Sequence, residues 1–525
     1  MQVFGIEGTA WAASAAYFDS DTDEVIIESD AYLPESGGIH PREAAEHMAE
    51  AIPRVIEAVF SVVRSSGEAI DAVAFSRGPG LGPCLRIVAS AARALAQTLE
   101  VPLVGVNHMV AHLEIGRHRS GFENPVCLNA SGANAHVLGY HNGRYQVLGE
   151  TMDTGVGNAL DKFARHLDWD HPGGPKIEDA STEGEYIPLP YVVKGMDFSF
   201  SGIMSAAKAA VDSGERVKNV CFSLQENVFG MLTEVTERAL SLAGSDELVL
   251  GGGVGQNTRL KGMLETMCAA RGASFYAPEA RFLRDNAGMI AVLGAEMANA
   301  GDTLAIEESR VNPNFRPDQV EITWREGGSV SRAPTDSKEV IGAEATVEIG
   351  DVVRKQRLPK GYRHPELDSR LRRERTASEA RLTSLARRAG VPTPVVVDID
   401  LHEGEIVFER VGETDLIEEL TSERVRAVGR HLAVCHNAGF VHGDPTPRNA
   451  RLSRKRTYCI DFGLGYHTDE VEDFAMDLHV FERSLAGTAA EFERCKAAFE
   501  RGYREAGDTA VLSQLRAIEG RGRYR

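Results

Sequence analysis

A repeated order of short apolar segments and helical segments constrains the fold of this chain more than any other feature. The first cycle begins with the apolar segment Gln2–Ile6, continues through a helical pattern over Pro41–Ser65 and reaches a second apolar segment at Ala72–Phe75. A second cycle begins at Val126–Asn129 and reaches the apolar segment Glu247–Leu250. Strands that alternate with helices are typical of α/β proteins. The sequence therefore predicts a duplicated α/β architecture of two lobes.

The pattern lapses in a stretch rich in Gly, Ser, Pro and Arg that includes REGGSVSRAPTDS. At 525 residues the chain exceeds the roughly 250–300 residues at which single cores stop growing, so at least two domains are expected. We predict a first domain over residues 1–318, with lobes of about 1–120 and 121–318, and a linker over 319–340. A second domain over 341–525 is expected to begin with strands at Ala345–Lys355 and helices from Leu367.

Composition limits the class of protein and its compartment. There is no basic segment followed by an apolar core at the N-terminus, and no apolar run approaches the roughly 18 residues of a membrane helix. The seven cysteines are scattered and never form a CxxC pair, which argues against disulfides and a zinc ribbon. We therefore expect a soluble cytoplasmic protein that does not bind membranes.

The net charge of −20 is unevenly distributed. Residues from Ile341 onward carry −1 and the preceding part carries −19. An acidic surface repels phosphate, so the C-terminal part is the better platform for RNA. Its basic clusters are either RNA contacts or solvated surfaces: Arg354–Arg375, Arg448–Arg456 and Arg521–Arg525.

Three glycine-rich turns follow predicted strands in the first domain: Ile6–Thr9, Ala130–Asn134 and Gly251–Asn257. Glycine lets the backbone approach a ligand closely and expose its N–H groups to phosphate. One such turn means little, but three in a duplicated α/β chain favour a nucleotide site.

Two histidines, His108 and His112, stand four residues apart. On a helix this spacing places both rings on one face, as a metal site requires, although two such histidines can equally be surface or core residues. Asp285 offers a carboxylate that would complete the site. The glutamate of a zinc-peptidase HExxH motif is missing, so a peptidase is unsupported.

The second domain carries the spacing of a kinase catalytic loop and DFG segment. Asp444 would orient the substrate hydroxyl as the catalytic residue, while Asn449 and Asp461 would hold Mg²⁺. Lys355 on a predicted strand would contact the phosphates of ATP, and Glu379 on a predicted helix would pair with it. The loop that should cover the phosphates reads Gly-Ala-Glu-Ala at 342–345 and lacks GxGxxG.

Ordered motifs over about residues 1–316 resemble the tRNA N6-threonylcarbamoyladenosine transferase family, the actin-like catalytic subunit of the KEOPS complex. The motifs are GIEGTA, GGIHPREAAEH, FSRGPGLGPCLR, NHMVAH, GNALDKFAR, HPGGPKIE, FSFSG, GGGVGQN and RDNAGMIA. The resemblance implies an actin/Hsp70-like (RNase H-like) fold. It also implies transfer of threonylcarbamoyl from threonylcarbamoyl-AMP to N6 of adenosine 37 in tRNAs that read ANN codons.

The same resemblance implies roles for individual residues. It implies that His108, His112 and Asp285 bind one divalent metal, iron or zinc. The residues that match the family's substrate contacts are Asn129, Ala130, Ser131, Gly132, Ala133, Asp161, Gly174, Glu178 and Asn257. The family usually reads YVSGGN where this chain reads NASGAN, so Asn129 stands in place of a metal-binding tyrosine and leaves the fourth ligand open.

The segment over about residues 341–525 is similar to the small KEOPS kinase family, which is p53-related-kinase-like, on HGDPTPRN, IDFGLG and EDFAMDLHV. The resemblance implies a small atypical Ser/Thr kinase or ATPase of α+β fold that supports tRNA modification. It also implies other KEOPS subunits as partners, one that promotes dimerisation and one that activates the kinase. Two alternatives remain: a signalling Ser/Thr kinase with an actin-fold binding module, and an actin-fold small-molecule kinase.

Overall fold

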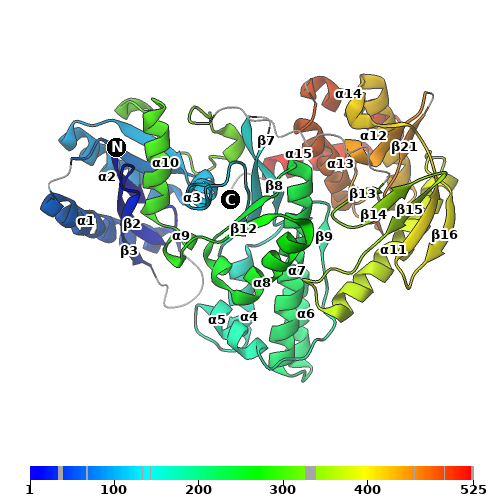
Figure 1. Cartoon of the computed structure of the whole chain (residues 1–525), viewed down its shortest axis with the longest axis horizontal. Helices are drawn as coiled ribbons and strands as arrows, with labels where there is room; N and C mark the ends of the chain where they lie inside the picture. Colours follow the sequence, from blue (N-terminus) through cyan, green and yellow to red (C-terminus); the bar gives the residue numbers. More distant parts are fainter. Residues whose placement is uncertain are drawn as a thin grey trace. The chain divides into compact units, whose positions relative to one another are not determined.

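The computed structural model describes residues 1–32, 40–66, 69–132, 134–141, 143–325, 339–454, 456–489 and 491–521. The described residues form two compact units. Unit 1 consists of Met1–Asp179 and Leu242–Ser331, and unit 2 of Ala180–Ser241 and Arg332–Arg523. Each unit is described by itself below, with elements labelled as in Figure 1.

Unit 1 contains two five-stranded sheets of the same topology. The first has the order β3-β2-β1-β4-β5 and the second β8-β7-β6-β11-β12. In each, the three strands that come first along the chain form an antiparallel meander, and the last two strands are parallel to the first. The repetition confirms the duplicated α/β architecture that the sequence predicts. The strands are β1 (Gln2–Glu7), β2 (Ala12–Asp19), β3 (Glu24–Ala31), β4 (Ala72–Gly78), β5 (Leu103–Asn107), β6 (Val126–Ala130), β7 (Ala135–His141), β8 (Arg144–Glu150), β11 (Glu247–Gly251) and β12 (Ser274–Tyr276).

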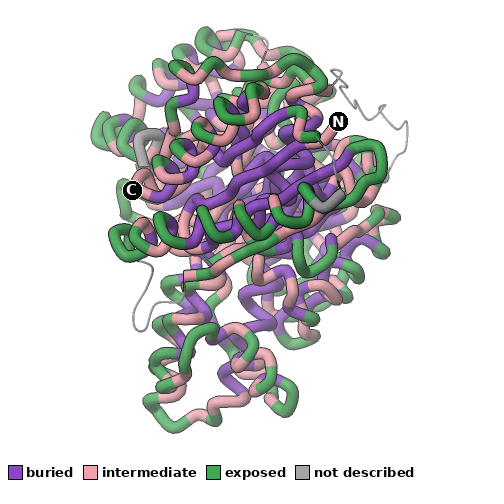
Figure 2. The backbone as a smooth tube through the Cα atoms, turned by 90° about the vertical axis from the view of Figure 1, so that its left-hand side faces the viewer, coloured by how far each residue is buried: buried purple, intermediate pink, exposed green. Residues whose placement is uncertain are grey.

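Helices cover both faces of the first sheet. Because successive side chains of a strand point to opposite faces, Phe4 and Ile6 of β1 join a core beneath α1 and α2, whereas Val3 joins a core with α3 and α10. Strands β1 and β2 are correspondingly buried, and exposed residues gather on the outer helices (Figure 2). The helices of this unit are α1 (Pro41–Ser66), α2 (Gly82–Leu99), α3 (His108–Ser120), α4 (Val156–His166), α5 (Gly173–Ser181), α8 (Thr258–Arg271), α9 (Ala280–Leu283) and α10 (Ala287–Asn299).

The start of the predicted linker packs on unit 1. Val320, Ile322 and Trp324 lie against its core, and Arg325 pairs with the buried Glu114 at 3.1 Å. Residues 326–338, the middle of the predicted linker, lie outside the described residues. The predicted domain boundary therefore stays a prediction.

Unit 2 combines a segment of the predicted first domain with the predicted kinase. That segment contributes the short strands β9 (Val193–Lys194) and β10 (Asp197–Phe198), α6 (Ser201–Asp212) and most of α7 (Val217–Ala243). An antiparallel sheet of order β13-β14-β15-β17-β16 follows, together with the long α11 (Pro365–Arg388). The strands are β13 (Glu339–Ile341), β14 (Thr346–Ile349), β15 (Val352–Gln356), β16 (Val396–Asp400) and β17 (Glu405–Glu409).

The rest of unit 2 is mainly helical. Its core includes Leu432, Phe481 and Phe499 from three of its helices. The helices of this part are α12 (Ser422–Asn437), α13 (Val471–Ala486), α14 (Phe492–Arg504) and α15 (Thr509–Arg521). Short strands complete it: β18 (Thr414–Asp415), β19 (Phe440–Val441), β20 (Ala450–Leu452), β21 (Thr457–Cys459) and β22 (Tyr466–His467).

The composition predicts that the chain has no membrane-spanning helix and no disulfides. Within them, no helix combines the length and apolar character that crossing a membrane requires. All seven cysteines are reduced and buried. The scattered cysteines thus behave as small apolar core residues, as their spacing predicts.

Candidate functional site

The two histidines of unit 1 lie at the start of α3. The Asn107 side chain caps this helix by accepting hydrogen bonds from the backbone N–H groups of Met109 and Val110. His108 is the first helical residue and His112 follows one turn later, so their rings lie 4.9 Å apart between centroids. The helix that the motif requires is therefore present, and it begins at His108.

Asp285, which follows α9, joins the two histidines. The Nε2 atoms of His108 and His112 lie 3.4 and 3.3 Å from the same carboxylate oxygen of Asp285. One ligand atom from each residue lies within 4.8 Å of the others, and among the described His, Cys, Asp and Glu residues this is the one cluster with metal-binding spacing. The structure thus brings Asp285 to the two histidines, although His112 and Asp285 are 173 positions apart in the sequence.

Glu7, at the end of β1, was not singled out by the sequence motifs and belongs to this site. Its fully buried carboxylate lies 3.1 Å from Nδ1 of His108. A carboxylate on the far nitrogen fixes the orientation and tautomer of a metal-binding imidazole. The signal was present in GIEGTA, but only the fold places Glu7 beside α3.

The electrostatics of the cluster favour a cation. Burial lowers the pKa of His108, but Glu7 and Asp285 outweigh it and raise that pKa to about 10. Burial raises the pKa of Asp285, yet the neighbouring histidines hold it well below its usual range. Burial lowers the pKa of His112, which stays neutral and able to bind a metal. Two carboxylates around two imidazoles therefore stabilise one positive charge.

The donor set also fits a metal. Two imidazole nitrogens and a carboxylate oxygen are ligands that zinc and iron accept. Nδ1 of His112 and Oδ1 of Asn129 are buried and make no hydrogen bond within the described part of the chain. Asn129 stands at the end of β6 opposite Gly251 of β11, close to His112. Its unpartnered amide oxygen is compatible with the fourth ligand that the sequence left open.

The turn after β11 needs glycine at Gly252. Its φ is +84°, and a Cβ there would lie 2.3 Å from the carbonyl oxygen of Ala130. Only glycine allows this left-handed backbone and this approach of the two strand ends. The predicted turn at Ala130–Asn134 therefore lies against the predicted turn at Gly251–Asn257. Ala133, one of its predicted substrate contacts, lies outside the described residues.

The other predicted substrate contacts border these turns. Ser131 and Gly132 accept hydrogen bonds at α4, which carries Asp161. Oδ1 of Asp161 accepts a hydrogen bond from the N–H of Gly173 at 2.8 Å. The next residue, Gly174, faces open space, because a Cβ added there would meet no atom within 4 Å. Glu178 of α5 accepts from the N–H of Thr258 at 2.9 Å, next to Asn257, which caps α8. One chain of contacts thus connects all of these residues.

In unit 2 the predicted ATP-binding residues meet. Nζ of Lys355 on β15 lies 2.9 Å from Glu379 on α11 and 2.6 Å from Asp461. Burial raises the pKa of Asp461, but Lys355 outweighs this and lowers it to about 2. Arg357 also binds Glu379, at 2.5 Å, and the sequence did not single it out. The lysine is therefore held by two carboxylates, of which one is a predicted Mg²⁺ ligand.

The predicted catalytic loop is held by a buried acid from α13. Asp477 accepts hydrogen bonds from the backbone N–H groups of His442 and Gly443, both at 2.8 Å. Asn449 donates to Asp444 at 3.2 Å, so the predicted catalytic and Mg²⁺-binding side chains adjoin. Burial is the largest cause that raises the pKa of Asp444, and the charge of Asp461 adds to it. Asp477 lies in the motif EDFAMDLHV, but the sequence alone did not indicate what this residue does.

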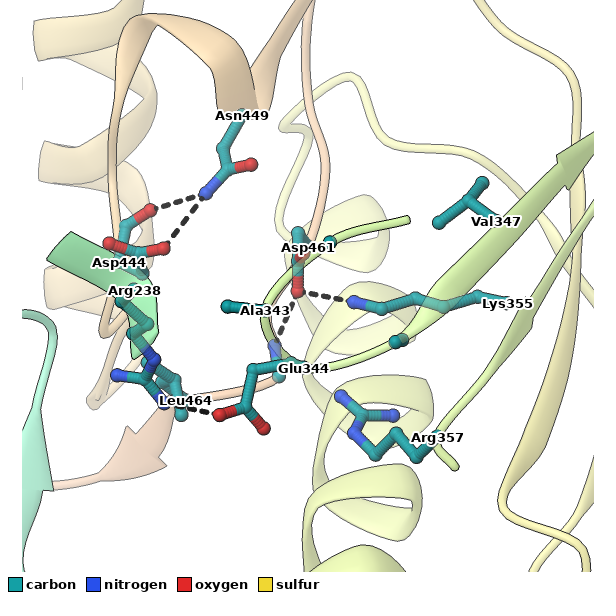
Figure 3. Close-up of a pocket in the computed structure, with 13 residues that line it drawn as sticks. Arg238, Ala343, Glu344, Val347, Lys355, Arg357, Asp444, Asn449, Asp461 and Leu464 are labelled. Carbon is teal, nitrogen blue, oxygen red and sulfur yellow. Dashed lines mark hydrogen bonds and ion pairs between the residues drawn. The ribbon is translucent and has the colours of Figure 1, made fainter. Parts of the chain in front are cut away.

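A cavity of about 170 Å³ is lined by Lys355, Arg357, Asp444, Asn449 and Asp461 (Figure 3). Arg238 of α7 also lines it, together with Glu344 of the segment that lacks GxGxxG. Nothing in the kinase motifs points to Arg238, because it comes from the segment Ala180–Ser241 of the predicted first domain. The kinase-like cavity therefore includes a side chain that only tertiary structure reveals.

Comparisons with known proteins identify the family of the chain. The model of the family described as TsaD, tRNA N6-adenosine threonylcarbamoyltransferase, matches residues 22–292. A probable bifunctional tRNA threonylcarbamoyladenosine biosynthesis protein of Halobacterium salinarum is 68% identical over 528 residues, which cover 100% of this chain and 99% of the relative. A protein of the same description from Methanocorpusculum labreanum is 51% identical, with 100% and 99% covered. The chain therefore belongs to the tRNA N6-adenosine threonylcarbamoyltransferase family and functions in tRNA modification.

Proposed function

We propose that unit 1 holds a divalent metal on His108, His112 and Asp285 and transfers a threonylcarbamoyl group from threonylcarbamoyl-AMP to N6 of adenosine 37 of tRNA. The observation that carries the proposal is the convergence of three donor atoms within 4.8 Å, next to the strand end that bears Asn129. An alternative in which unit 1 phosphorylates a small molecule leaves this cluster without a purpose.

The reaction needs positioning more than activation. The N6 amine attacks the carbamoyl carbon, a C–N bond forms, the C–O bond to the phosphate breaks, and AMP leaves while the amine loses a proton to solvent. Because the acyl phosphate is already activated, binding residues have to align the two reactants. Asp161 on α4, Glu178 on α5 and Asn257 at the N-cap of α8 are suited to hold the adenylate, since these positions border the glycine turns.

The metal, when bound, would act as a Lewis acid that stabilises negative charge developing on the substrate. Glu7 keeps the imidazole of His108 in the orientation that a ligand needs, through the 3.1 Å contact to Nδ1. We propose either iron or zinc as the metal, because imidazole and carboxylate ligands bind both.

The test compares two histidines of the same helix. His108→Ala should lose the metal, measured by elemental analysis of the purified protein, and should abolish threonylcarbamoyladenosine formation. Formation is measured by nucleoside mass spectrometry with tRNA, ATP, threonine, bicarbonate and an adenylate-forming enzyme. His118→Ala is the control, because His118 pairs with Asp23 at 2.7 Å and lies outside the cluster. Normal modification by a metal-free His108→Ala protein would refute the metal proposal.

For unit 2 we propose a kinase or ATPase site that binds ATP with Mg²⁺ through Lys355, Asn449 and Asp461, with Asp444 as the catalytic residue. The juxtaposition of Lys355, Glu379 and Asp461 supports it, since the Lys–Glu pair and the Mg²⁺-binding acid must both be in place in protein kinases. Calorimetric titration of the full chain with MgATP tests it, and absence of binding would refute it. We also propose that other KEOPS-type subunits act with the chain.

A further inference from the structure

The helix α7 carries a row of buried charges toward the kinase-like part of unit 2. Glu234 and Arg238, one turn apart, are 1% and 8% exposed at their side chains. Charged side chains this deeply buried are rare unless they are paired. Both bind residues that the sequence places more than a hundred positions later, in the predicted kinase.

Three arginines share two carboxylates here. Glu234 binds Arg238, Arg363 and Arg375, with the Arg363 contact at 2.5 Å and the nearest Arg375 contact at 2.9 Å. Glu344 binds Arg238 and Arg375, both at 2.8 Å. These five residues, the α7 charge cluster, carry one positive charge more than they carry negative charge. Arg363 also contacts Asp368 at 3.4 Å, which partly offsets this excess and leaves Arg238 and Arg375 as the arginines that Glu344 contacts.

Glu344 stands where a kinase holds the phosphates of ATP. It belongs to the segment 342–345, which occupies the place of the glycine-rich loop between β13 and β14. Figure 3 shows its carboxylate between Arg238 on one side and Asp461 and Lys355 on the other. The cavity of about 170 Å³ is smaller than the roughly 300–1,000 Å³ of ligand pockets, and Glu344 is one of the side chains that line it.

We propose that Arg238 is a phosphate-binding residue of the kinase-like site, and that its guanidinium exchanges the Glu344 carboxylate for a phosphate oxygen when ATP enters. The inference rests on the proposed ATP site of unit 2. A carboxylate and a phosphate are interchangeable partners for arginine, because both accept its paired N–H donors. Glu344 thus occupies the anion position while the nucleotide is absent.

The exchange leaves Arg238 anchored. Its guanidinium also binds Glu234 and donates to the carbonyl oxygen of Gly195, and neither contact involves Glu344. Arg375 likewise keeps Glu234 after Glu344 departs. A guanidinium fixed on two sides loses little conformational freedom when it binds phosphate. Arg238 is therefore ready to bind an anion without rearrangement of α7.

Titration calorimetry of the full chain with MgATP and with adenosine tests the proposal. Arg238→Ala removes a charge-assisted hydrogen bond to phosphate and should weaken MgATP binding by about 10–100-fold, while adenosine affinity changes by less than about 3-fold. Glu344→Gln removes the competing carboxylate and should strengthen MgATP binding severalfold. Arg373→Ala, an exposed arginine of α11, is the charge-matched control and should change neither. Arg238→Lys keeps a charge and should fall between wild type and Arg238→Ala.

The possible outcomes test the phosphate role of Arg238 separately from the proposed ATP site of unit 2. If the wild type fails to bind MgATP, the ATP site itself is refuted. If the wild type binds and Arg238→Ala binds MgATP equally or more tightly, the site stands and the phosphate role of Arg238 is refuted. If Arg238→Ala fails to fold, Glu344→Gln decides: unchanged or weaker MgATP binding overturns the exchange.

Discussion

Replacement of Glu234 by glutamine is the sharpest test of how unit 2 is held together. The Glu234 carboxylate is 1% exposed and accepts from Tyr191 at 2.7 Å as well as from the three arginines of the α7 charge cluster. Glutamine has nearly the same volume, but it removes the negative charge and points an N–H₂ group at guanidinium donors. Breaking a buried ion pair by removal of one partner costs about 3–5 kcal/mol.

This magnitude predicts a measurable shift in one unit only. With a urea dependence of about 1–3 kcal/mol per molar, a loss of about 3–5 kcal/mol lowers the unfolding midpoint of unit 2 by roughly 1 M or more. Hydrogen exchange of peptides from α12 and α14, followed by mass spectrometry in increasing urea, reports on unit 2. The three tryptophans, Trp11, Trp169 and Trp324, all lie in unit 1, so their fluorescence follows unit 1 separately.

The urea midpoints of both units are also measured for a control variant, Glu493→Gln. Glu493→Gln removes an exposed carboxylate of α14 and should leave both transitions in place. A midpoint shift of unit 2 below about 0.3 M for Glu234→Gln would mean that the arginines find other partners. The buried cluster would then not be what secures α7 in unit 2.

Two further predictions concern a buried histidine and a glycine turn. Burial lowers the pKa of His431 to about 4, so the stability that this residue contributes is present above the unfolded pKa near 6.5 and is lost as pH falls toward 4. His431→Gln should remove about 1 kcal/mol per pH unit of that decline, measured by urea unfolding. The control His402→Gln, at an exposed histidine, should leave the decline unchanged. Gly252→Ala should destabilise unit 1 by more than about 1 kcal/mol in thermal unfolding, because the new Cβ would meet Ala130, and Gly262→Ala in α8, with open space around it, should not. A pH dependence of stability in His431→Gln as steep as that of wild type, or equal melting of the two glycine variants, would contradict the respective argument.

The sequence alone determined which elements form and which local motifs they carry. Hydrophobic periodicity is a property of neighbouring residues, so the helix at Pro41–Ser65 and the strands of both lobes could be predicted before any contact was known. The spacing of His108 and His112 places both rings on one face if the segment is helical, and the spacing of Asp444 from Asn449 indicated a kinase loop. These inferences need only local geometry.

Tertiary structure alone decided what meets these motifs. Glu7 reaches His108 because the end of strand β1 comes to the start of α3, and no local pattern encodes such a meeting. Arg238 reaches the kinase-like cavity because α7 belongs to the same compact unit as β15 and α11, although the sequence assigns it to the other domain. A buried charge must find its partner wherever the chain supplies one, and the cost of leaving it unpaired acts through space, independent of distance along the sequence.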